Sequence, residues 1–310
     1  MKVLVTGANG FVGSALVTQL LQSRNTVLGA VRSRESELPP NAERVVMGDI
    51  TPNTDWRGAV AGVNVVIHLA SRVHVLRDTA RQPSSEFRRI NVDATRSLAR
   101  QAVEAGVTRF VFISSLKVNG DTGTFRESDT PAPRDPYGIS KHEAESALAE
   151  IGSQTGMEIV VVRPPLVYGP GVKANFRALM LAVARGIPLP FGAVDNRRSL
   201  IGLDNLVDAI IRCGEHPAAA NETFLVSDGM DLSTPDLIRM LAAAMRRKAR
   251  LIPVPVSLMR GAAQILNRGD VAQRLLGSLQ VDITKARRVL DWTPPVTVDE
   301  GLRRAVRDLQ

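Results

Sequence analysis

Residues 2–13 read KVLVTGANGFVG, and this stretch decides the fold class. A short apolar run meets three glycines, Gly7, Gly10 and Gly13, and a helical pattern over residues 11–23 follows at once. Glycines let the backbone turn tightly and approach a pyrophosphate, while the helix N-terminus supplies free N–H groups and a partial positive charge. A glycine-rich turn also fits an ordinary strand-to-helix connection, but its place after the first strand predicts a dinucleotide site.

Outward from this turn, the first half of the chain alternates short apolar runs with longer helical patterns. Fully apolar runs such as residues 65–67 indicate a parallel sheet buried on both faces, and right-handed crossovers make that sheet doubly wound. The fold class predicted is therefore α/β, a Rossmann fold. The predicted strands are 2–6, 26–31, 44–47, 64–69, 109–114, 158–163 and 223–227. The predicted helices are 11–23, 54–61, 84–105, 137–155, 232–244, 257–266 and 298–309.

The alternation of strand and helix patterns ends after Arg163, where frequent prolines and glycines indicate a loop-rich region. Segments that leave and rejoin the main sheet indicate a smaller C-terminal lobe for the substrate. We expect residues 1–168 with 199–227 to form the dinucleotide-binding Rossmann domain. Residues 169–198 with 228–310 are expected to form the substrate-binding lobe.

Composition limits the class of protein. The chain of 310 residues is 44% hydrophobic, which is ordinary for a globular protein, and its one cysteine, Cys213, excludes a disulfide within the chain. The N-terminal apolar run is too short for a signal peptide, and no apolar stretch approaches the ~18 residues of a membrane span. We therefore expect a cytoplasmic protein. The four histidines show no zinc-ligand spacing, so no metal site is expected.

The net charge of +8 is compatible with several anionic partners. Aromatic residues make up only 4% of the chain and do not interleave with a basic cluster, which argues against nucleic-acid binding. Residues 245–264 mix arginines with apolar side chains and allow two interpretations. They could touch a membrane surface, but a solvated face over a core-packed helix is the favoured one.

Cofactor choice is read at the end of the second strand. An acidic residue there would bind the adenosine ribose of NAD, but the sequence places Arg32 and Arg34 there, and a guanidinium suits a 2′-phosphate. We therefore expect NADP(H) and leave NAD(H) possible, with Glu35 or Glu37 as the acceptor in that case. Asp49, after the third strand, is expected to meet the adenine amino group.

The catalytic prediction rests on one of only two tyrosines. Tyr137 and Lys141 are four residues apart on a predicted helix and so share a face. A phenol has a pKa near ~10, and a neighbouring ammonium and an oxidised nicotinamide should lower it and make the phenol a usable base. Ser115 follows the fifth strand, at the edge where doubly wound sheets bind ligands. A chance pair of this spacing is common, but its order after the phosphate loop favours chemistry.

These motifs together resemble the extended short-chain dehydrogenase/reductase family, which includes nucleotide-sugar epimerases, dehydratases and keto-reductases. Further motifs that carry the resemblance are Val118 and Gly120 after Ser115, Asn91, residues 163–165, residues 167–169, Asp282 and residues 285–286. The resemblance implies that Ser115, Tyr137 and Lys141 are catalytic. The expected cofactor contacts are Gly7, Gly10, Phe11, Val12, Gly13, Arg32, Asp49, Ile50, His68, Leu69, Ala70, Asn91, Ser114, Tyr137, Lys141 and Pro164.

The resemblance also implies a site for a UDP-linked hexose in the C-terminal lobe and a homodimer formed through the helices of 84–105 and 137–155. Members of the family hold the diphosphate with an Asn-hydrophobic pair and an arginine before a strand. The candidates for contact with the sugar or its phosphates are His74, Lys117, Asn175, Phe176, Arg198 and Arg274.

Three activities within the resemblance differ in their residues. Dehydratases carry an Asp-Glu pair directly after the catalytic hydroxyl, and this sequence has Leu116-Lys117 there, so we reject dehydration. Residues 71–75, 117–120 and 277–282 are most similar to UDP-N-acetylquinovosamine dehydrogenases, and Arg32 favours net reduction. We therefore expect a 4-keto reductase of a UDP-4-keto-6-deoxy-N-acetylhexosamine for surface polysaccharide. A UDP-sugar 4-epimerase with tightly held NAD is the alternative, and a non-catalytic NADP-binding regulatory protein is a remote one.

Overall fold

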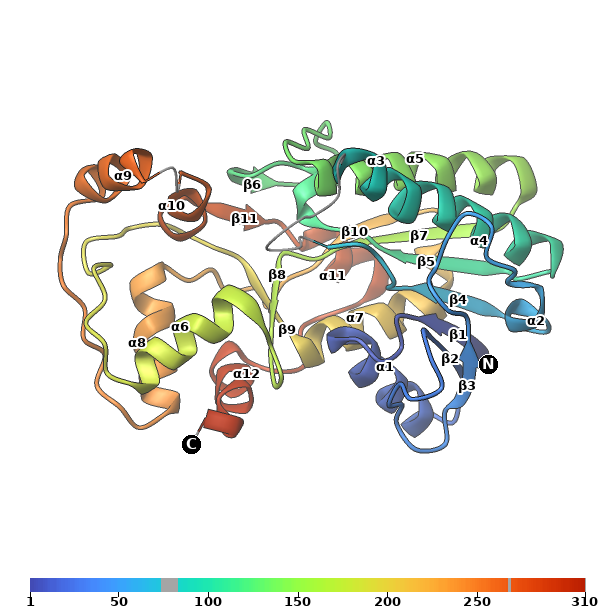
Figure 1. The fold of residues 1–310 in the computed structure, drawn as a ribbon, viewed down its shortest axis with the longest axis horizontal. Coiled ribbons are helices and arrows are strands. Elements are labelled where there is room, and N and C mark those ends of the chain that lie inside the picture. The colour runs from blue at the N-terminus through green and yellow to red at the C-terminus, as the bar shows by residue number, and fades with distance from the viewer. Residues whose placement is uncertain (74–82, 267–268, 310) are drawn as a thin grey trace.

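The computed structural model describes residues 1–73, 83–266 and 269–309. Its centre is a sheet of seven strands, and every strand pair in it is parallel (Figure 1). In spatial order the strands are β10 (Thr223–Leu225), β7 (Glu158–Arg163), β5 (Arg109–Ile113), β4 (Val65–His68), β1 (Lys2–Thr6), β2 (Thr26–Val31) and β3 (Glu43–Val46). The chain starts at the sheet centre and winds outward in both directions, which confirms the predicted Rossmann fold.

Helices cover both faces of the sheet, as the apolar strands require. On one face lie α1 (Phe11–Gln22) and α7 (Leu203–Glu215), and their apolar residues share one buried core with β1, β4 and β7. On the other face α2 (Arg57–Val60), α4 (Ala94–Glu104) and α5 (Pro136–Thr155) bury a second core. Burial on both faces explains why the strands read as continuous apolar runs.

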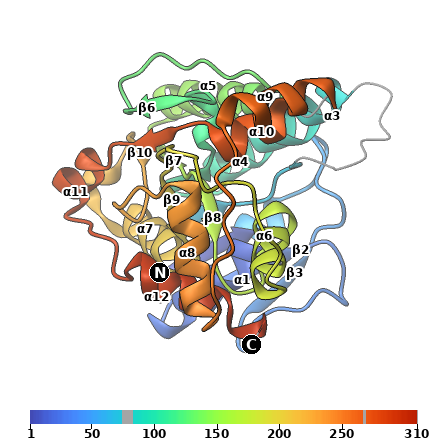
Figure 2. The same ribbon diagram turned by 90° about the vertical axis from the view of Figure 1, so that its left-hand side faces the viewer.

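Outside the central sheet lie a third buried core, in the C-terminal lobe, and two small sheets. Apolar residues of α6 (Ala174–Ala184), α8 (Thr234–Ala244) and α12 (Val298–Ala305) pack around Tyr168. β8 (Leu166–Tyr168) pairs with β9 (Leu200–Gly202), and β6 (Gly123–Phe125) pairs with β11 (Leu279–Val281). Figure 2 shows this lobe from its outer side.

Several elements differ from the prediction. The helix expected over 84–105 is three consecutive pieces, α3 (Pro83–Arg88), a π-helical turn η1 (Arg89–Asp93) and α4. A π-turn inserts one extra residue per turn and is a frequent device at functional sites. Several elements of the structure were not predicted: α7, whose pattern is strongly amphipathic, α6, α10 (Gly269–Leu276), α11 (Thr284–Leu290) and the four strands of the small sheets.

The prediction of a core-packed helix in residues 245–264 is wrong for its second half. α9 (Val256–Ile265) has no buried residue and lies at the outer extremity of the C-terminal lobe (Figures 1 and 2). No helix in the described part of the chain combines the length and apolar character needed to cross a membrane.

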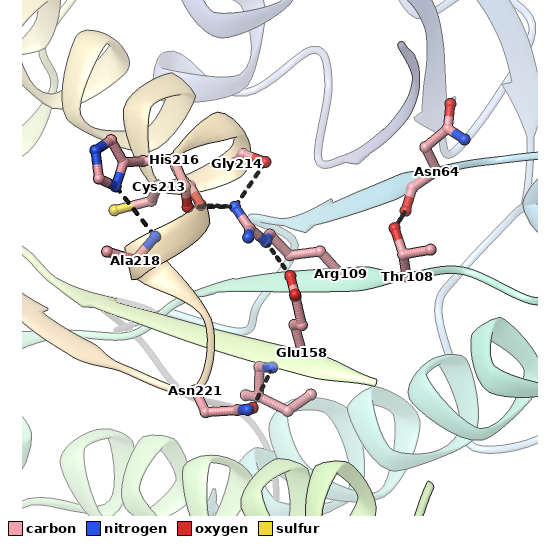
Figure 3. Close-up of polar contacts among 10 residues, drawn as sticks. Asn64, Thr108, Arg109, Glu158, Cys213, Gly214, His216, Ala218 and Asn221 are labelled. Atoms are coloured by element: carbon pink, nitrogen blue, oxygen red, sulfur yellow. Dashed lines mark hydrogen bonds and ion pairs between the residues drawn. The ribbon is translucent and has the colours of Figure 1, made fainter. Parts of the chain in front are cut away.

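At the amino end of β5, a buried arginine joins the sheet to a helix terminus (Figure 3). Arg109 Nε donates to Glu158 Oε2 at 2.7 Å, and its Nη1 donates to the carbonyls of Cys213, Gly214 and His216 at 2.9–3.1 Å. These carbonyls lie at the C-terminus of α7, where the helix itself leaves them without partners. Arg109 therefore ties α7 to the sheet.

Candidate active site and cofactor cleft

The phosphate loop between β1 and α1 is built so that only glycine fits. Gly7 has a φ of +67°, and the Gly10 amide donates to the Gly7 carbonyl at 2.9 Å. A Cβ on Gly13 would lie 2.0 Å from the Gly7 carbonyl oxygen, inside any contact distance. The first turn of α1 is therefore pressed directly against the loop, as the spacing of the three glycines predicts.

The N-terminus of α1 has free donors. Its N-cap is Gly10, with no side-chain cap and no acidic residue in the first turn. Uncapped N–H groups and the positive end of the helix dipole suit an anion. Phe11 and Val12 form that first turn and are half-buried. The loop therefore fits the pyrophosphate of a dinucleotide.

At the adenosine end, the predicted cation is already paired. Arg32 Nε lies 2.7 Å from Asp49 Oδ1, and both side chains are exposed. This pair offsets the charge that was expected to select a 2′-phosphate and engages the carboxylate that was expected to meet adenine. Ile50 is half-buried beside them. The geometry therefore gives no preference for NADP.

The end of β4 is held by a buried histidine rather than opened to a ligand. His68 Nδ1 lies 2.7 Å from Thr6 Oγ1, and Nε2 lies 2.9 Å from Thr95 Oγ1. Burial, followed by the nearby Lys141 charge, lowers the pKa of His68 to about 3, so the ring is neutral. Thr6 Oγ1 also accepts from the Ala70 amide at 3.1 Å, which lays Leu69 and Ala70 beside the phosphate loop. His68 therefore positions the cleft wall through its partners.

Asn91 has a similar positioning geometry. It lies in the π-turn and is buried, its Oδ1 accepts from the Arg72 amide at 2.7 Å, and its Nδ2 donates to the Arg72 carbonyl at 3.0 Å and to Ser140 Oγ at 2.9 Å. Ser140 Oγ in turn donates to the Tyr137 carbonyl at 2.8 Å. The amide of Asn91 thus links the segment after β4 to the first turn of α5, which carries Tyr137.

The structure brings the three predicted catalytic residues together. Asp135 caps α5 by accepting from the Gly138 amide at 2.7 Å, and this fixes where the helix that carries Tyr137 and Lys141 begins. The Tyr137 hydroxyl hydrogen-bonds to Ser115 and to Ser71. Lys141 Nζ is buried, donates to the Ile113 carbonyl at 2.8 Å and lies 5.9 Å from the centre of the Tyr137 ring.

The predicted acidification of Tyr137 is not found in the chain by itself. Burial raises the pKa of Tyr137 to about 12, although the Ser115 hydrogen bond opposes this. The neighbouring ammonium does not offset the burial, because burial also lowers the pKa of Lys141 itself to about 7, with Glu145 opposing. Desolvation disfavours both charged forms, so Tyr137 keeps its proton and Lys141 readily loses one.

One buried hydroxyl at this edge has no hydrogen-bond partner among the described residues. Ser114 Oγ, at the end of β5, is buried and unpaired, while the Ser114 amide donates to the Val162 carbonyl at 2.8 Å. The next turn is fixed by the Pro164 carbonyl, which accepts from the Leu116 amide at 3.0 Å. A buried hydroxyl without a partner is costly, and a bound ligand would supply one.

The predicted substrate contacts fall into separate groups. Lys117 Nζ is ion-paired with Asp121 and, at 3.1 Å, with Asp135, so its charge is engaged within the chain. Asn175 is exposed at the start of α6, while Phe176 is buried and stacks on Tyr168 at 5.6 Å between ring centres. His74 lies outside the described residues.

Arg198 and Arg274 form a group of like charges. Burial and then the charge of Arg274 lower the pKa of Arg198, whose Nη1 donates to the Gly277 carbonyl at 3.0 Å. No described carboxylate forms an ion pair with either guanidinium. Two nearby cations without a counter-charge suit a diphosphate.

Sequence reasoning missed the residues that position the site. Beyond Asp135 and Ser140, Glu145 accepts from Arg163 Nε at 3.0 Å and Nη2 at 2.5 Å, and Arg163 Nη1 donates to Asn119 at 3.0 Å. The spacing of Ser140 and Glu145 from Tyr137 and Lys141, three and four residues, was a usable signal. Their partners are far away in sequence and could not be read from it.

Comparisons with known proteins agree with this geometry. The profile of the NAD dependent epimerase/dehydratase family matches residues 3–227. The UDP-glucose 4-epimerase of Vibrio cholerae is 44% identical over 313 residues, covering 99% of this chain and 94% of the relative. MoeE5, solved with UDP-glucuronic acid and NAD, is 27% identical with a TM-score of 0.78, covering 99% of this chain and 98% of that chain. The UDP-glucuronic acid 4-epimerase from Bacillus cereus, solved with NAD, shares the fold at a TM-score of 0.80 and 24% identity, covering 98% of this chain and 94% of that chain.

Proposed function

Because the chain belongs to the NAD dependent epimerase/dehydratase family, we propose that it is a nucleotide-sugar 4-epimerase that acts on a UDP-hexose with NAD. The observation that carries the proposal is the assembled set of Ser115, Tyr137 and Lys141 beside a phosphate loop that fits a dinucleotide. The UDP-glucose 4-epimerase of Vibrio cholerae supports the epimerase alternative over the 4-keto reductase that the sequence favoured.

In the proposed reaction, Tyr137 exchanges a proton with the oxygen on carbon four of the sugar, and Ser115 holds that oxygen by a hydrogen bond. The bound nicotinamide supplies the acceptor and donor of the hydride. Lys141 lies at the ring face of Tyr137 and is placed to orient the nicotinamide ribose and to tune the phenol. A protonated Tyr137 must lose its proton before it can accept one, so ligand binding has to lower its pKa.

The same proposal assigns NAD, rather than NADP, as the cofactor. Arg32 is paired with Asp49, so a 2′-phosphate would have to displace that contact. An epimerase returns its hydride to the sugar and gains from a cofactor that stays bound. The uncapped α1 terminus and the unpaired Ser114 hydroxyl are the features that would retain it. Arg198 and Arg274 would hold the diphosphate of the UDP-sugar.

The test is to incubate the purified protein with UDP-glucose and to follow its carbon-four epimer by chromatography, together with nicotinamide absorbance. Interconversion without added cofactor and without a lasting change in absorbance is the expected result. Release of NAD, and not NADP, from the denatured protein should accompany it. Stoichiometric consumption of NADH or NADPH on a UDP-4-keto-6-deoxy-N-acetylhexosamine, with no epimerisation, would reject the epimerase.

One observation favours the 4-keto reductase as a second candidate. Burial keeps the proton on Tyr137, whose pKa is raised to about 12, and a keto-reductase needs a phenol that donates its proton to the keto oxygen. Dehydration is left aside, because buried Leu116 and ion-paired Lys117 take the place of the required acid and base. The domain limits given above and the homodimer through the helices of 84–105 and 137–155 stay predictions.

A further inference from the structure

The two arginines proposed to hold the diphosphate come from segments far apart in the chain. Arg198 lies two residues before β9, and Arg274 lies in the last turn of α10, which leads into β11 (Figure 1). Neither guanidinium forms an ion pair with a described carboxylate, and like charges repel each other. Other contacts must therefore hold the two segments together.

Asn196 makes contacts that join these segments. Its side chain is buried, and its Nδ2 donates to the Leu275 carbonyl at 3.2 Å and to the Gly277 carbonyl at 3.1 Å. Leu275 follows Arg274 directly, and both carbonyls lie at the end of α10, where a helix leaves carbonyls without partners of its own. One amide group thus ties the backbone next to Arg274 to the backbone next to Arg198.

The oxygen of the same amide holds the start of α8. Asn196 Oδ1 accepts from the Thr234 amide at 2.8 Å, and Thr234 Oγ1 donates to the Leu275 carbonyl at 2.7 Å. The orientation of the Asn196 amide is fixed, because two carbonyls require its NH2 group and a backbone N–H requires its oxygen. Three segments therefore meet at one buried side chain.

Arg198 belongs to the same arrangement. Its Nη1 donates to the Gly277 carbonyl at 3.0 Å, and this carbonyl also accepts from Asn196. The backbone amide and carbonyl of Arg198 both pair with Leu232, at 2.9 and 3.0 Å. A Cβ on Gly277 would lie 2.6 Å from the Gln273 carbonyl oxygen, so the turn after α10 is tightly closed. The backbone of Arg198 and one edge of its guanidinium are therefore fixed relative to the end of α10.

We propose that Asn196 is a positioning residue of the diphosphate site and holds Arg198 and Arg274 at the separation that one diphosphate can bridge. The inference rests on the proposed function, because it takes a UDP-sugar as the ligand. Bringing two cations together has an electrostatic cost. The hydrogen bonds of Asn196 offset this cost when the chain folds, so that ligand binding does not have to. Asn196 acts through the two arginines, so its role lies in affinity and not in the chemical step.

The experiment compares the full-length unaltered protein with an Asn196→Ala variant, by calorimetry with UDP and by steady-state kinetics on UDP-glucose. The Kd of UDP and the KM should rise about tenfold, while kcat and the content of bound NAD stay unchanged. The Kd of uridine, which lacks the phosphates, should also stay unchanged. In an Arg274→Met background, Asn196→Ala should weaken UDP binding by less than about twofold, because the cation that it positions is absent.

The matched control is Asn205→Ala. Asn205 is also buried, its Nδ2 donates to Asp228 Oδ1 and to the Val296 carbonyl, and its Oδ1 accepts from the Val296 amide. This variant should lose as much thermal stability as Asn196→Ala and keep its affinity for UDP. Thr234→Val removes one hydrogen bond to the end of α10, and as a milder second variant it should raise the Kd of UDP about threefold.

The outcomes separate this inference from the proposed function. If the unaltered protein binds UDP, then unchanged UDP affinity in Asn196→Ala and Thr234→Val would overturn the positioning role alone. An equal loss of UDP affinity in Asn205→Ala, or an equal loss of uridine affinity in Asn196→Ala, would also overturn it. An unaltered protein that does not bind UDP would overturn the proposed function, and this inference with it.

Discussion

The two ends of strand β5 each bury a cation, and the surroundings of the two cations are opposite. At the amino end Arg109 is 6% exposed and finds one carboxylate and three helix-terminal carbonyls (Figure 3). At the carboxyl end Lys141 is 1% exposed and makes one described hydrogen bond, to Ile113, under the faces of Phe112 and Tyr137. A buried charge normally requires full pairing, and Arg109 has it, so we assign this residue a structural role.

The carboxyl end keeps groups that the fold does not satisfy. Among the described residues the Ser114 hydroxyl has no hydrogen-bond partner, the N-terminus of α1 has no side-chain cap, and burial lowers the pKa of Lys141. Perturbed and under-satisfied groups gathered at one edge indicate a site that a ligand completes. Substitutions at the two ends should therefore act on different quantities, activity at one and stability at the other.

The largest expected effect is on turnover. Tyr137→Phe removes the proton that moves to and from the sugar oxygen, so kcat should fall by about 10²–10⁴-fold with little change in Tm. The matched control is Tyr168→Phe, since that hydroxyl donates to Asp228 at 2.7 Å in the lobe core. That variant should keep its kcat and lose about 1–3 kcal/mol of stability. Steady-state kinetics and thermal melts separate the two, and a Tyr137→Phe protein with full turnover would refute the catalytic assignment.

At the amino end the order of effects should reverse. Arg109→Met removes a donor from the Cys213 and Gly214 carbonyls of α7, from the carbonyl of its C-cap His216 and from the Glu158 carboxylate, so the protein should lose about 2–4 kcal/mol of unfolding free energy. Its kcat per folded molecule should stay unchanged. Urea unfolding gives the first quantity, and kinetics at low temperature give the second. A drop in kcat without a loss of stability would contradict a structural role for Arg109.

The buried amine predicts how stability changes with pH. The pKa of Lys141 falls from 10.5 to about 7 on folding, so between these values the unfolded chain holds a proton that the folded chain has released. Raising the pH across this window therefore stabilises the folded protein, and below it the cost of the buried charge is fully present. Lys141→Met should lack this gain. Melting both cofactor-free proteins from pH 7 to pH 10 should show the wild type rising relative to the variant, and parallel curves would contradict it.

The smallest effect is expected at Ser114. Because its hydroxyl has no described partner, Ser114→Ala should leave the melting temperature unchanged or slightly higher, within about 1 kcal/mol. Binding of the nicotinamide cofactor should weaken about threefold to tenfold if the hydroxyl is reserved for it. Thr95→Ala is the contrasting variant, since Thr95 holds His68 and its loss should lower stability. Fluorescence titration with NADH measures the first effect, and equal loss of stability in both variants would argue against a reserved hydroxyl.

How much could be predicted differs between elements. The strands β1, β2, β4, β5 and β7 were predicted within a residue or two, because burial on both faces forces continuous apolar runs. The two small sheets, one of β6 with β11 and one of β8 with β9, were not predicted. A strand of three residues is too short to show a periodic pattern, and these strands pair across long sequence separations. The helix of 84–105 was predicted as continuous because a π-turn leaves no mark in composition.

Within the site, local spacing predicted which residues share a helical face but not their ionisation. The four-residue step from Tyr137 to Lys141 places both on one helical face in any helix. In the chain by itself the pKa of Tyr137 is raised by burial, and this burial depends on surrounding segments that the helix itself does not specify. Likewise, the sequence shows the charge of Arg32 but not its ion pair with Asp49. Asp49 follows the next strand and was predicted to contact adenine.

The sequence by itself determined the α/β class, the phosphate loop and the identity of the Tyr137 and Lys141 pair, because these follow from glycine geometry, burial and helical spacing. Only the tertiary structure decided which polar groups are satisfied. It paired Arg32 and Lys117 with carboxylates, enclosed His68 between two threonines, and left the Ser114 hydroxyl without a partner among the described residues. The reason is physical: satisfaction and burial depend on contacts between residues distant in sequence, and those contacts exist only once the chain has folded.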